Sequence, residues 1–377
     1  MRLIGTFGEV LPLLVGAFLS AALISLLITP LVRRLAIRLD NVDRPDHRRV
    51  NKGPIPRGGG IGVATAFVLV SLGVLLVNAR LEIIPIPRSI DQTELLGLLV
   101  GGIVATFIGV LDDTLQLRAR WQLLGQVAVA ALAVASGIVV TFVNNPFGAG
   151  AIVLSGPYAI GFTMVWIVGM INSINFIDGL DGLSSGIALI AAVTLGVISV
   201  TTATNQPFVG VLCFALAGSL LGFLRWNFHP ASIFIGTSGV MFVGYTLALL
   251  SILGTAKVVV ALLVLGVPII DTFWIIVRRL ATGHSPFTPD RKHIHHRLLD
   301  LGLTHGQTVL VIYGICILLA ILSFVLSGTG QVYAFMGLAV AFGLVLFLAT
   351  RGESGDALEA ESYEPDPPPN EPDRPPS

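Results

Sequence analysis

Long runs of apolar residues alternate with short polar segments along most of this chain. Eleven of the runs are long enough to cross the roughly 30 Å hydrocarbon core of a bilayer. They lie near 11–33, 59–78, 94–110, 122–142, 157–173, 184–203, 206–224, 234–254, 257–277, 308–327 and 331–349. The pattern predicts an all-α, polytopic membrane protein with about eleven transmembrane helices.

The composition supports this class. Of the 377 residues, 54% are apolar and 12% are charged, whereas a soluble globular protein carries roughly 25% charged residues. The formal net charge is zero, so the charge balance gives no indication of a nucleic-acid partner, and we expect none. Cys213 and Cys316 stand singly in apolar runs, which excludes a disulfide framework or a zinc-binding spacing.

The distribution of basic residues predicts the orientation. Eleven crossings place residues 34–57, 111–121, 174–183, 225–233, 278–307 and the tail after 350 on one side. Eighteen of the 22 lysines and arginines fall on that side when Arg33 is counted with it. Because positively charged short loops stay in the cytoplasm, we expect the N-terminus outside and the C-terminus in the cytoplasm.

The N-terminal and C-terminal segments are expected to differ in structure. The first apolar run is long and is followed by Arg33 and Arg34, so we expect an anchor rather than a cleaved signal peptide. Residues 351–377 hold eight acidic residues among prolines and are expected to be a disordered cytoplasmic tail. The transmembrane domain is expected to span residues 1–350.

The first predicted cytoplasmic loop is basic and includes Lys52 and Arg57. One interpretation is a loop attracted to anionic lipid without specificity. The other is a substrate-binding loop, because prolines and the glycines from Gly58 to Gly60 fix or free the backbone at defined positions.

Asp112 and Asp113 end the third apolar run. Neighbouring carboxylates repel each other and oppose the dipole at a helix C-terminus. A metal ion or another bound cation would relieve this conflict, and Arg118 or Arg120 would be the alternative source of positive charge.

Polar residues recur between Asn172 and Asp181. Asn172, Asn175 and Asp178 are spaced by three residues and are predicted to lie along one helix face at the membrane boundary. Amide and carboxylate oxygens are ligands that Mg²⁺ accepts. Polar residues at such depth are functional by default, so this segment is the most specific candidate site.

The last long loop interleaves histidine with basic residues. His293, His295, His296 and Arg297 favour phosphate recognition over a transition-metal site, because no carboxylate pair accompanies the histidines. Asp271 lies inside the preceding run and is either a packing contact or the partner of Arg278 or Arg279.

Together these segments resemble the polyprenyl-phosphate N-acetylhexosamine-1-phosphate transferases. The resemblance runs from about Asp40 to Gly302 and rests on five segments in order. They are the Pro-x-Pro-Arg-Gly-Gly loop, Asp112-Asp113, Asn172 to Gly182, Val267 to Asp271, and Ser285 to Arg297. The last segment looks like that of the N-acetylglucosamine-1-phosphate branch.

The resemblance implies a reaction. A polyprenyl monophosphate such as undecaprenyl phosphate attacks the β-phosphorus of a UDP-N-acetylhexosamine, which releases UMP and initiates a cell-envelope glycan. The site is then expected on the cytoplasmic face of the bacterial inner membrane, with Mg²⁺ (or Mn²⁺) as the metal ion. Membrane lipid is an expected partner, and a homodimer is compatible with the sequence.

The resemblance also implies roles for individual residues. Asn175 takes the position of a metal ligand, and Asp178 and Asp181 shape the nucleotide and metal site. Arg120 stands where the family has a lysine that holds phosphate, and Asp112 and Asp113 belong to the lipid-phosphate side. Lys52, Arg57, Asn172, His293, His295, His296 and Arg297 are expected to bind substrate.

One segment departs from the family pattern. After Asn227 to Ala231 the family has a lysine, an aspartate that binds the metal, and a serine, where this chain has Ser232, Thr237 and Val240. A threonine hydroxyl is a neutral ligand for Mg²⁺. Two hypotheses follow: a transferase with an altered metal shell, or a catalytically silent paralogue that binds the lipid carrier or the UDP-sugar.

A transporter or flippase is a further alternative of a different class. It predicts charged residues deep in several spans and functional groups on both sides of the membrane. Only Asp271 is clearly internal, and the predicted outer loops carry few charges, so the sequence favours a transferase.

The orientation leads to a labelling prediction. In intact cells, a membrane-impermeant thiol reagent should modify a cysteine placed at Asn145 but not one placed at Ser285, because only the former is expected outside. Labelling at Ser285 from outside would contradict the predicted topology.

Overall fold

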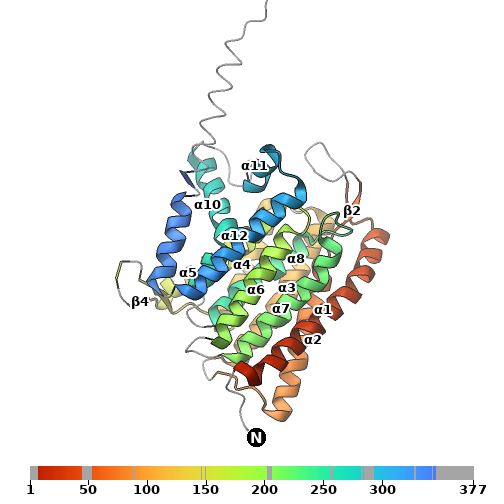
Figure 1. Ribbon diagram of the computed structural model, residues 1–377. Helices are drawn as coiled ribbons and strands as arrows, with labels where there is room; N and C mark the ends of the chain where they lie inside the picture. Colours follow the sequence, from red (N-terminus) through yellow and green to blue (C-terminus); the bar gives the residue numbers. More distant parts are fainter. Residues whose placement is uncertain are drawn as a thin grey trace, which may run out of the picture. The chain divides into compact units, whose positions relative to one another are not determined.

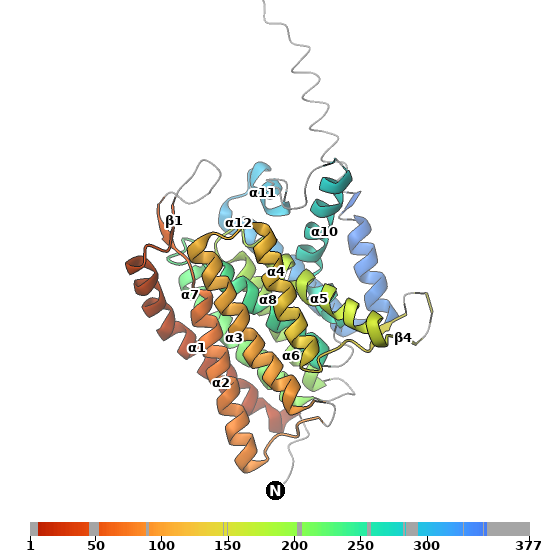
Figure 2. The same ribbon diagram turned by 180° about the vertical axis from the view of Figure 1, so that it is seen from behind.

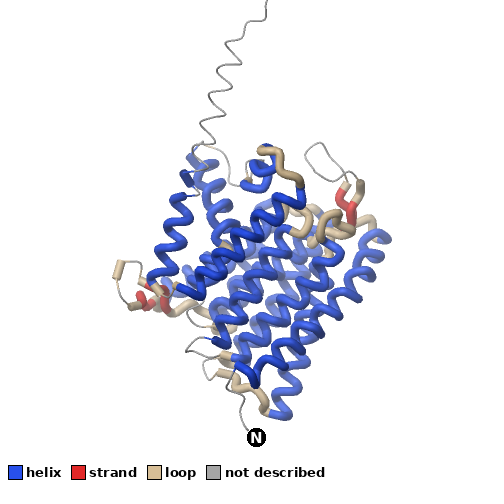
Figure 3. Tube along the Cα trace, viewed as in Figure 1, coloured by secondary structure: helices blue, strands red, loops and turns tan. Residues whose placement is uncertain are grey.

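The computed structural model describes residues 7–344 except 45–52, 88–89, 146, 149, 202–205, 255–257, 282, 284–292, 327 and 342. Residues Met1–Phe335 form one compact unit, and the second unit, Met336–Ser377, lies mostly outside the described residues. The expected tail over 351–377 therefore lies outside them too, as does Lys52. Figure 3 shows that the described chain is overwhelmingly helical, so the all-α prediction is confirmed.

The helices follow one another with short connections. Their bounds are α1 Phe7–Arg38, α2 Gly60–Leu81, α3 Gln92–Leu115, α4 Ala119–Ala135, α5 Gly156–Ile177, α6 Leu183–Thr201, α7 Pro207–Asn227, α8 Gly236–Leu253, α9 Val258–Val264, α10 Gly266–Ala281, α11 Ile294–Asp300 and α12 His305–Val325. A further helix spans Thr329–Ala341.

Each of the eleven predicted ranges overlaps a helix, but the helices differ in length. In the described part of the chain, 8 helices are long and apolar enough to cross a membrane by themselves. The helix α4 and the helix Thr329–Ala341 are shorter. The number of crossings thus stays a prediction.

The range predicted as one span at 257–277 is broken. Its two halves, α9 and α10, meet at an angle of 79°. Pro268 is the third residue of α10. Proline has no backbone N–H, which costs no hydrogen bond in the first turn of a helix but would remove one inside a continuous helix. The bend therefore follows from proline placement, which hydrophobicity alone does not show.

Close packing of α1 against α7 depends on two glycines. Gly218 and Gly222 lie one turn apart on α7, and a Cβ at these positions would be 2.1 Å from the Phe18 carbonyl oxygen and 2.2 Å from that of Ala22. Small residues four apart let two membrane helices bring their backbones together, which increases their dispersion contacts.

The helix α8 is buried among α2, α3, α5 and α6. Tyr245 reaches from α8 to α3, where its hydroxyl donates to the Gly97 carbonyl oxygen at 2.7 Å. Gly101 leaves the room for this ring, since a Cβ there would be 1.9 Å from the tyrosine oxygen. The middle of α8 is consequently held against α3.

Two small antiparallel sheets lie at opposite ends of the helices (Figures 1 and 2). Val42–Asp43 (β1) pairs with Ile55–Pro56 (β2) in the first predicted cytoplasmic loop. Phe142–Asn144 (β3) pairs with Ala151–Val153 (β4) in a predicted outer loop. The two sheets thus mark the two ends to which the sequence assigns the loops.

The α1–α7 contact leads to a stability prediction. We expect Gly222→Ala to lower the free energy of unfolding by about 1–3 kcal/mol, the usual effect of overpacking, because the new methyl group meets backbone atoms. Gly73→Ala in α2 is the matched control, since no atom lies within 4 Å of its Cβ position. Thermal unfolding in detergent measures both, and equal midpoints would contradict the packing argument.

Candidate active site

The first and fourth predicted cytoplasmic loops are joined by backbone hydrogen bonds. The amides of Gly59 and Gly60 donate to Phe234 and Ile235 at 2.9 and 2.8 Å, and Phe234 donates back to Pro56. A Cβ at Gly60 would be 2.0 Å from Gly239. The glycines of the first loop therefore permit close contact between the starts of α2 and α8.

Asp113 caps the start of α8 from the end of α3. Its carboxylate accepts the Thr237 amide at 2.8 Å and the Ser238 amide at 3.0 Å. These amides belong to the first turn of α8, where backbone N–H groups lack helical partners and the helix dipole is positive. Gly236 permits this approach, since a Cβ there would be 2.5 Å from the carboxylate.

Asp112 has neutral donors around it. It accepts the Thr237 hydroxyl at 2.6 Å, the Gln122 side-chain amide at 2.8 Å and the Leu117 backbone amide at 3.0 Å. Arg120 is exposed and lies over the Trp121 ring. The conflict expected at this acidic pair is thus eased by the dipole of α8 and by neutral groups.

The segment from Asn172 to Asp181 divides between two sites. Asn172 pairs with Gln126 of α4 at 2.7 Å, whereas Asp178 and Asp181 lie in the loop beyond the end of α5 at Ile177. Tyr313 of α12 holds that loop by donating to Gly182 at 2.5 Å. The predicted single helix face therefore ends before Asp178.

The pKa of the Asp178 carboxyl group is raised. Burial raises its pKa to about 6, against a hydrogen bond from Ser184 that lowers it, while the charge of Asp113 raises it further. The Ser184 hydroxyl donates this hydrogen bond to the Asp178 carboxylate at 2.5 Å. Burial thus disfavours the ionised form of Asp178, whereas a nearby cation would favour it.

Asp181 lies beside His229 and His305, two histidines that were not predicted as site residues. It pairs with His229 Nδ1 at 2.7 Å and accepts the Ala231 amide at 3.0 Å. His305 stacks on His229 with ring centroids 4.2 Å apart. One ligand atom from each of Asp181, His229 and His305 lies within 4.8 Å of the others. Their distant positions in the sequence concealed this cluster.

These groups line a cleft of about 740 Å³. The predicted site residues among its lining are Arg57, Asp113, Asn175, Asp178, Asp181, Thr237 and His296. Arg57 forms an ion pair with Asp43 there. Asp112, Arg120, Asn172, His293, His295 and Arg297 are not among the described residues that line it.

The histidine segment is anchored to α10. Asp271 is buried and accepts His293 Nδ1 at 2.8 Å and the Ile294 amide at 3.1 Å. The second bond holds the first residue of α11, which also carries Arg297. Neither alternative predicted for Asp271 named this partner, which is His293.

His295 packs beneath the Asp178 loop. A Cβ at Gly179 would be 2.2 Å from its Nε2 atom, and neither ring nitrogen has a hydrogen-bond partner among the described residues. Burial lowers the pKa of His295 well below its ordinary value, and the neighbouring histidines act in the same direction. His295 is thus a neutral ring at neutral pH, and Gly179 makes room for it.

A groove of about 750 Å³ runs between α4, α5 and α10. Its lining is mainly apolar, with Leu123, Val127, Val165 and Ile276 among the members. Asn172, Arg279 and His293 line it as well. Asn175 lines both the groove and the cleft, so the two spaces meet at this residue.

Comparisons with known proteins identify the family. Residues 95–255 match the model of glycosyl transferase family 4. The "Probable undecaprenyl-phosphate N-acetylglucosaminyl 1-phosphate transferase" of Bacillus subtilis is 36% identical over 89% of this chain and 90% of its own length. A decaprenyl-phosphate N-acetylglucosaminephosphotransferase of Mycolicibacterium smegmatis is 36% identical over 88% of this chain and 86% of its own.

The chain belongs to the polyprenyl-phosphate N-acetylhexosamine-1-phosphate transferase family. A more distant member, the undecaprenyl-phosphate alpha-N-acetylglucosaminyl 1-phosphate transferase of Yersinia pestis, is 31% identical over 77% of this chain and 78% of its own.

The structure shows the contacts of Ser232, Thr237 and Val240, the three residues at which the sequence departs from the expected family pattern. The Ser232 hydroxyl donates to Trp226 at 2.9 Å, and Val240 is buried in α8. The Thr237 hydroxyl donates to the Asp112 carboxylate at 2.6 Å. The cleft still offers oxygen ligands from Asp113, Asn175 and Asp178, and this set fits a hard divalent cation.

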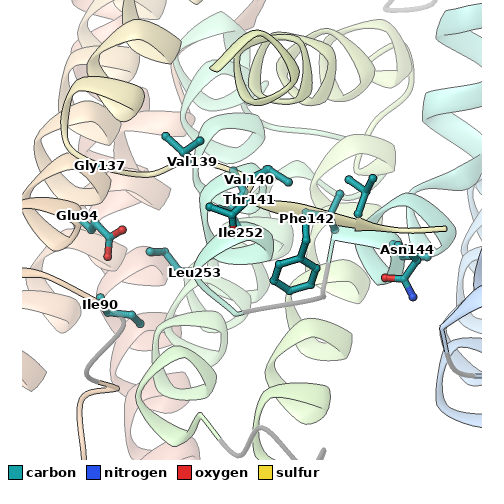
Figure 4. Close-up of a pocket in the computed structure, with 13 residues that line it drawn as sticks. Ile90, Glu94, Gly137, Val139, Val140, Thr141, Phe142, Asn144, Ile252 and Leu253 are labelled. Atoms are coloured by element: carbon teal, nitrogen blue, oxygen red, sulfur yellow. The ribbon is translucent and has the colours of Figure 1, made fainter. Parts of the chain in front are cut away.

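A smaller cavity of about 220 Å³ lies at the opposite end of α3 (Figure 4). Glu94 is the one acid among the described residues that line it. Its carboxylate accepts the Asp91 amide at 2.9 Å in a capping box at the start of α3. Helix capping accounts for Glu94, so the cavity has no evident role in catalysis.

The Thr237–Asp112 contact leads to a prediction on stability. With a chelator present, Thr237→Asp should lower the midpoint of thermal unfolding, because a new carboxylate would repel those of Asp112 and Asp113. Added Mg²⁺ should restore the midpoint in this variant and shift the wild type less.

Thr237→Asn is the control, because asparagine has the same size as aspartate but carries no charge. If both variants unfolded at the same temperature in chelator, the repulsion would be absent and the proposed proximity of the three carboxyl groups would be refuted.

Proposed function

We propose that this protein transfers N-acetylglucosamine-1-phosphate from UDP-N-acetylglucosamine to undecaprenyl phosphate or a similar polyprenyl phosphate, releasing UMP. The observation that carries the proposal is a polar cleft that meets an apolar groove at Asn175. A water-soluble sugar nucleotide and a lipid phosphate need such adjoining sites. The names of the relatives from Bacillus subtilis and Mycolicibacterium smegmatis agree with it.

The reaction exchanges one phosphorus–oxygen bond for another. An oxygen of the acceptor phosphate forms a bond to the β-phosphorus of the donor, and the bond from that phosphorus to the bridging oxygen breaks, so UMP departs with the electron pair. A phosphate monoester has a second pKa near ~6, so the acceptor is mostly dianionic at neutral pH. Positioning and charge stabilisation are then the main tasks of the protein.

The cleft residues divide these tasks. Asp113, Asn175 and Asp178 would hold Mg²⁺, for which Mn²⁺ is the expected substitute. When bound, the metal ion neutralises charge on the pyrophosphate and on the departing UMP. Arg57 and His296 line the same cleft and are assigned to the phosphate groups of the donor. Asp181 with His229 and His305 forms the adjoining wall.

The cleft is proposed to face the cytoplasm. Eighteen of the 22 lysines and arginines lie on the side of its loops, and short positive loops stay inside. Sugar nucleotides are cytosolic, so this orientation gives the donor direct access. The protein would then act as a multi-pass protein of the bacterial inner membrane.

Asp178 provides the test of this function. Asp178→Asn keeps the volume of the side chain and removes its charge, so we expect release of UMP from UDP-N-acetylglucosamine to fall by about 10²-fold or more, the magnitude usual for lost electrostatic stabilisation. Purified protein with undecaprenyl phosphate and Mg²⁺ is the assay.

Glu82→Gln is the matched control. It removes one negative charge at the exposed end of α2 and should leave the rate unchanged within experimental error. If the asparagine variants of Asp112, Asp113 and Asp178 all released UMP at the wild-type rate, the proposed site would be wrong. A wild-type protein that releases no UMP would instead support the silent paralogue.

A further inference from the structure

We infer that Asp181, His229 and His305 bind a divalent first-row transition metal ion, for which Zn²⁺ is the probe, at a site separate from the oxygen ligands proposed for Mg²⁺. The inference goes beyond the proposed function and does not rest on it. The ion would join three elements: the loop after α5, the loop after α7 and the start of α12.

The three side chains lie close enough to share an ion. One ligand atom from each lies within 4.8 Å of the others, and the ring centroids of His229 and His305 are 4.2 Å apart. Ligands bonded to Zn²⁺ at about 2.0–2.2 Å in a tetrahedral arrangement lie roughly 3.4 Å from one another. Small side-chain rotations would therefore bring the three atoms to one ion.

The donor atoms favour a transition metal over Mg²⁺. Imidazole nitrogen suits Zn²⁺ and related ions, whereas Mg²⁺ takes oxygen ligands. Two histidines and one carboxylate leave a coordination position for water, as in zinc sites with three protein ligands. The His229 side chain is 47% exposed, so an ion can reach the cluster from water. In the part of the chain that the structure describes, no second group of three such ligands lies so close together.

His305 has no hydrogen bond that accounts for its place. Both of its ring nitrogens are buried, and neither has a hydrogen-bond partner among the described residues. A buried polar atom without a partner costs free energy. A bond from one of these nitrogens to a metal ion would lower that cost.

The three ligands are positioned by contacts that do not involve an ion. Asp181 accepts the Ala231 amide at 3.0 Å, which ties its loop to the loop that carries His229. The side chain of Thr304 caps α12, of which His305 is the first residue. A site organised in this way loses less conformational entropy when a ligand binds.

The alternative is a simple pair between Asp181 and His229, whose Nδ1 atom lies 2.7 Å from the carboxylate. This pair accounts for two of the three side chains but gives the His305 nitrogens no partner. It predicts no tight binding of Zn²⁺, so a measurement of metal affinity distinguishes the two explanations.

Titration of the full-length protein in detergent tests the site without requiring turnover. The protein is treated with a chelator, dialysed, and titrated with Zn²⁺ by calorimetry in millimolar Mg²⁺, which fills the proposed oxygen ligands. We expect one tight Zn²⁺ site per chain, at which Mg²⁺ binds at least about 100-fold more weakly.

The variant that combines His229→Asn with His305→Gln removes both nitrogen ligands. It should bind Zn²⁺ at least about 100-fold more weakly, since the loss of even an outer-shell partner of a metal site costs about 10–100-fold in affinity. Asp181→Asn keeps an acceptor for the Ala231 amide but loses the anionic ligand, and should weaken Zn²⁺ binding by at least about tenfold.

His296→Gln is the matched control. His296 lines the same cleft but does not belong to the group of three ligands, so this variant should bind Zn²⁺ as tightly as the wild type does.

Thermal unfolding measures whether the ion stabilises the folded protein. An ion that binds only the folded state raises the midpoint of unfolding. We expect Zn²⁺ to raise it in the wild type and in His296→Gln but not in the double variant. The midpoint of the double variant in chelator shows whether that variant folds.

Three results would overturn the site: a folded double variant that binds Zn²⁺ as tightly as the wild type, a wild type that binds no Zn²⁺, or a wild type from which Mg²⁺ displaces it. If the double variant does not fold, Asp181→Asn decides the question, and wild-type affinity in that variant would refute the site. None of these measurements uses a substrate, so release of UMP tests the proposed function separately.

Discussion

The arrangement of the site depends on the contact between Asp113 and the first turn of α8. Two adjacent carboxylates at the end of a membrane helix need positive charge or hydrogen-bond donors close by. The amides of Thr237 and Ser238 supply donors, and the glycines at the start of α8 and α2 let the backbones approach. Once α3 and α8 are joined in this way, the cleft between their ends and the Asp178 loop is determined.

Thr237 alters the electrostatics of this contact. The resemblance to the family predicts a carboxylate at its position, and beside Asp112 and Asp113 such a group would require a cation for stability. Here the hydroxyl donates to Asp112 at 2.6 Å, so the contact is stable with neutral groups. Among the other carboxylates of the cleft, Asp178 is held in surroundings that disfavour its charge.

The bend between α9 and α10 relates the apolar groove to the cleft. The two helices meet at 79°. The helix α10 brings Thr272 and Arg279 to the groove, and its Asp271 anchors His293. The histidine segment therefore joins two spaces of different polarity. A transferase that acts on one soluble and one lipid substrate needs this junction, which Asn175 completes from α5.

The sequence by itself determined the helical class, the family, and most of the polar residues of the cleft. Apolar runs and their spacing report membrane helices directly, because each helix satisfies its own backbone hydrogen bonds. Only the tertiary structure separated Asn172 from Asp178, paired Asp271 with His293, and placed His229 and His305 beside Asp181. These contacts join residues far apart in the chain, and no local pattern encodes which loops will meet. The cap on α8 likewise depends on a neighbouring helix, and the bend at α10 depends on Pro268, so hydrophobicity alone revealed neither.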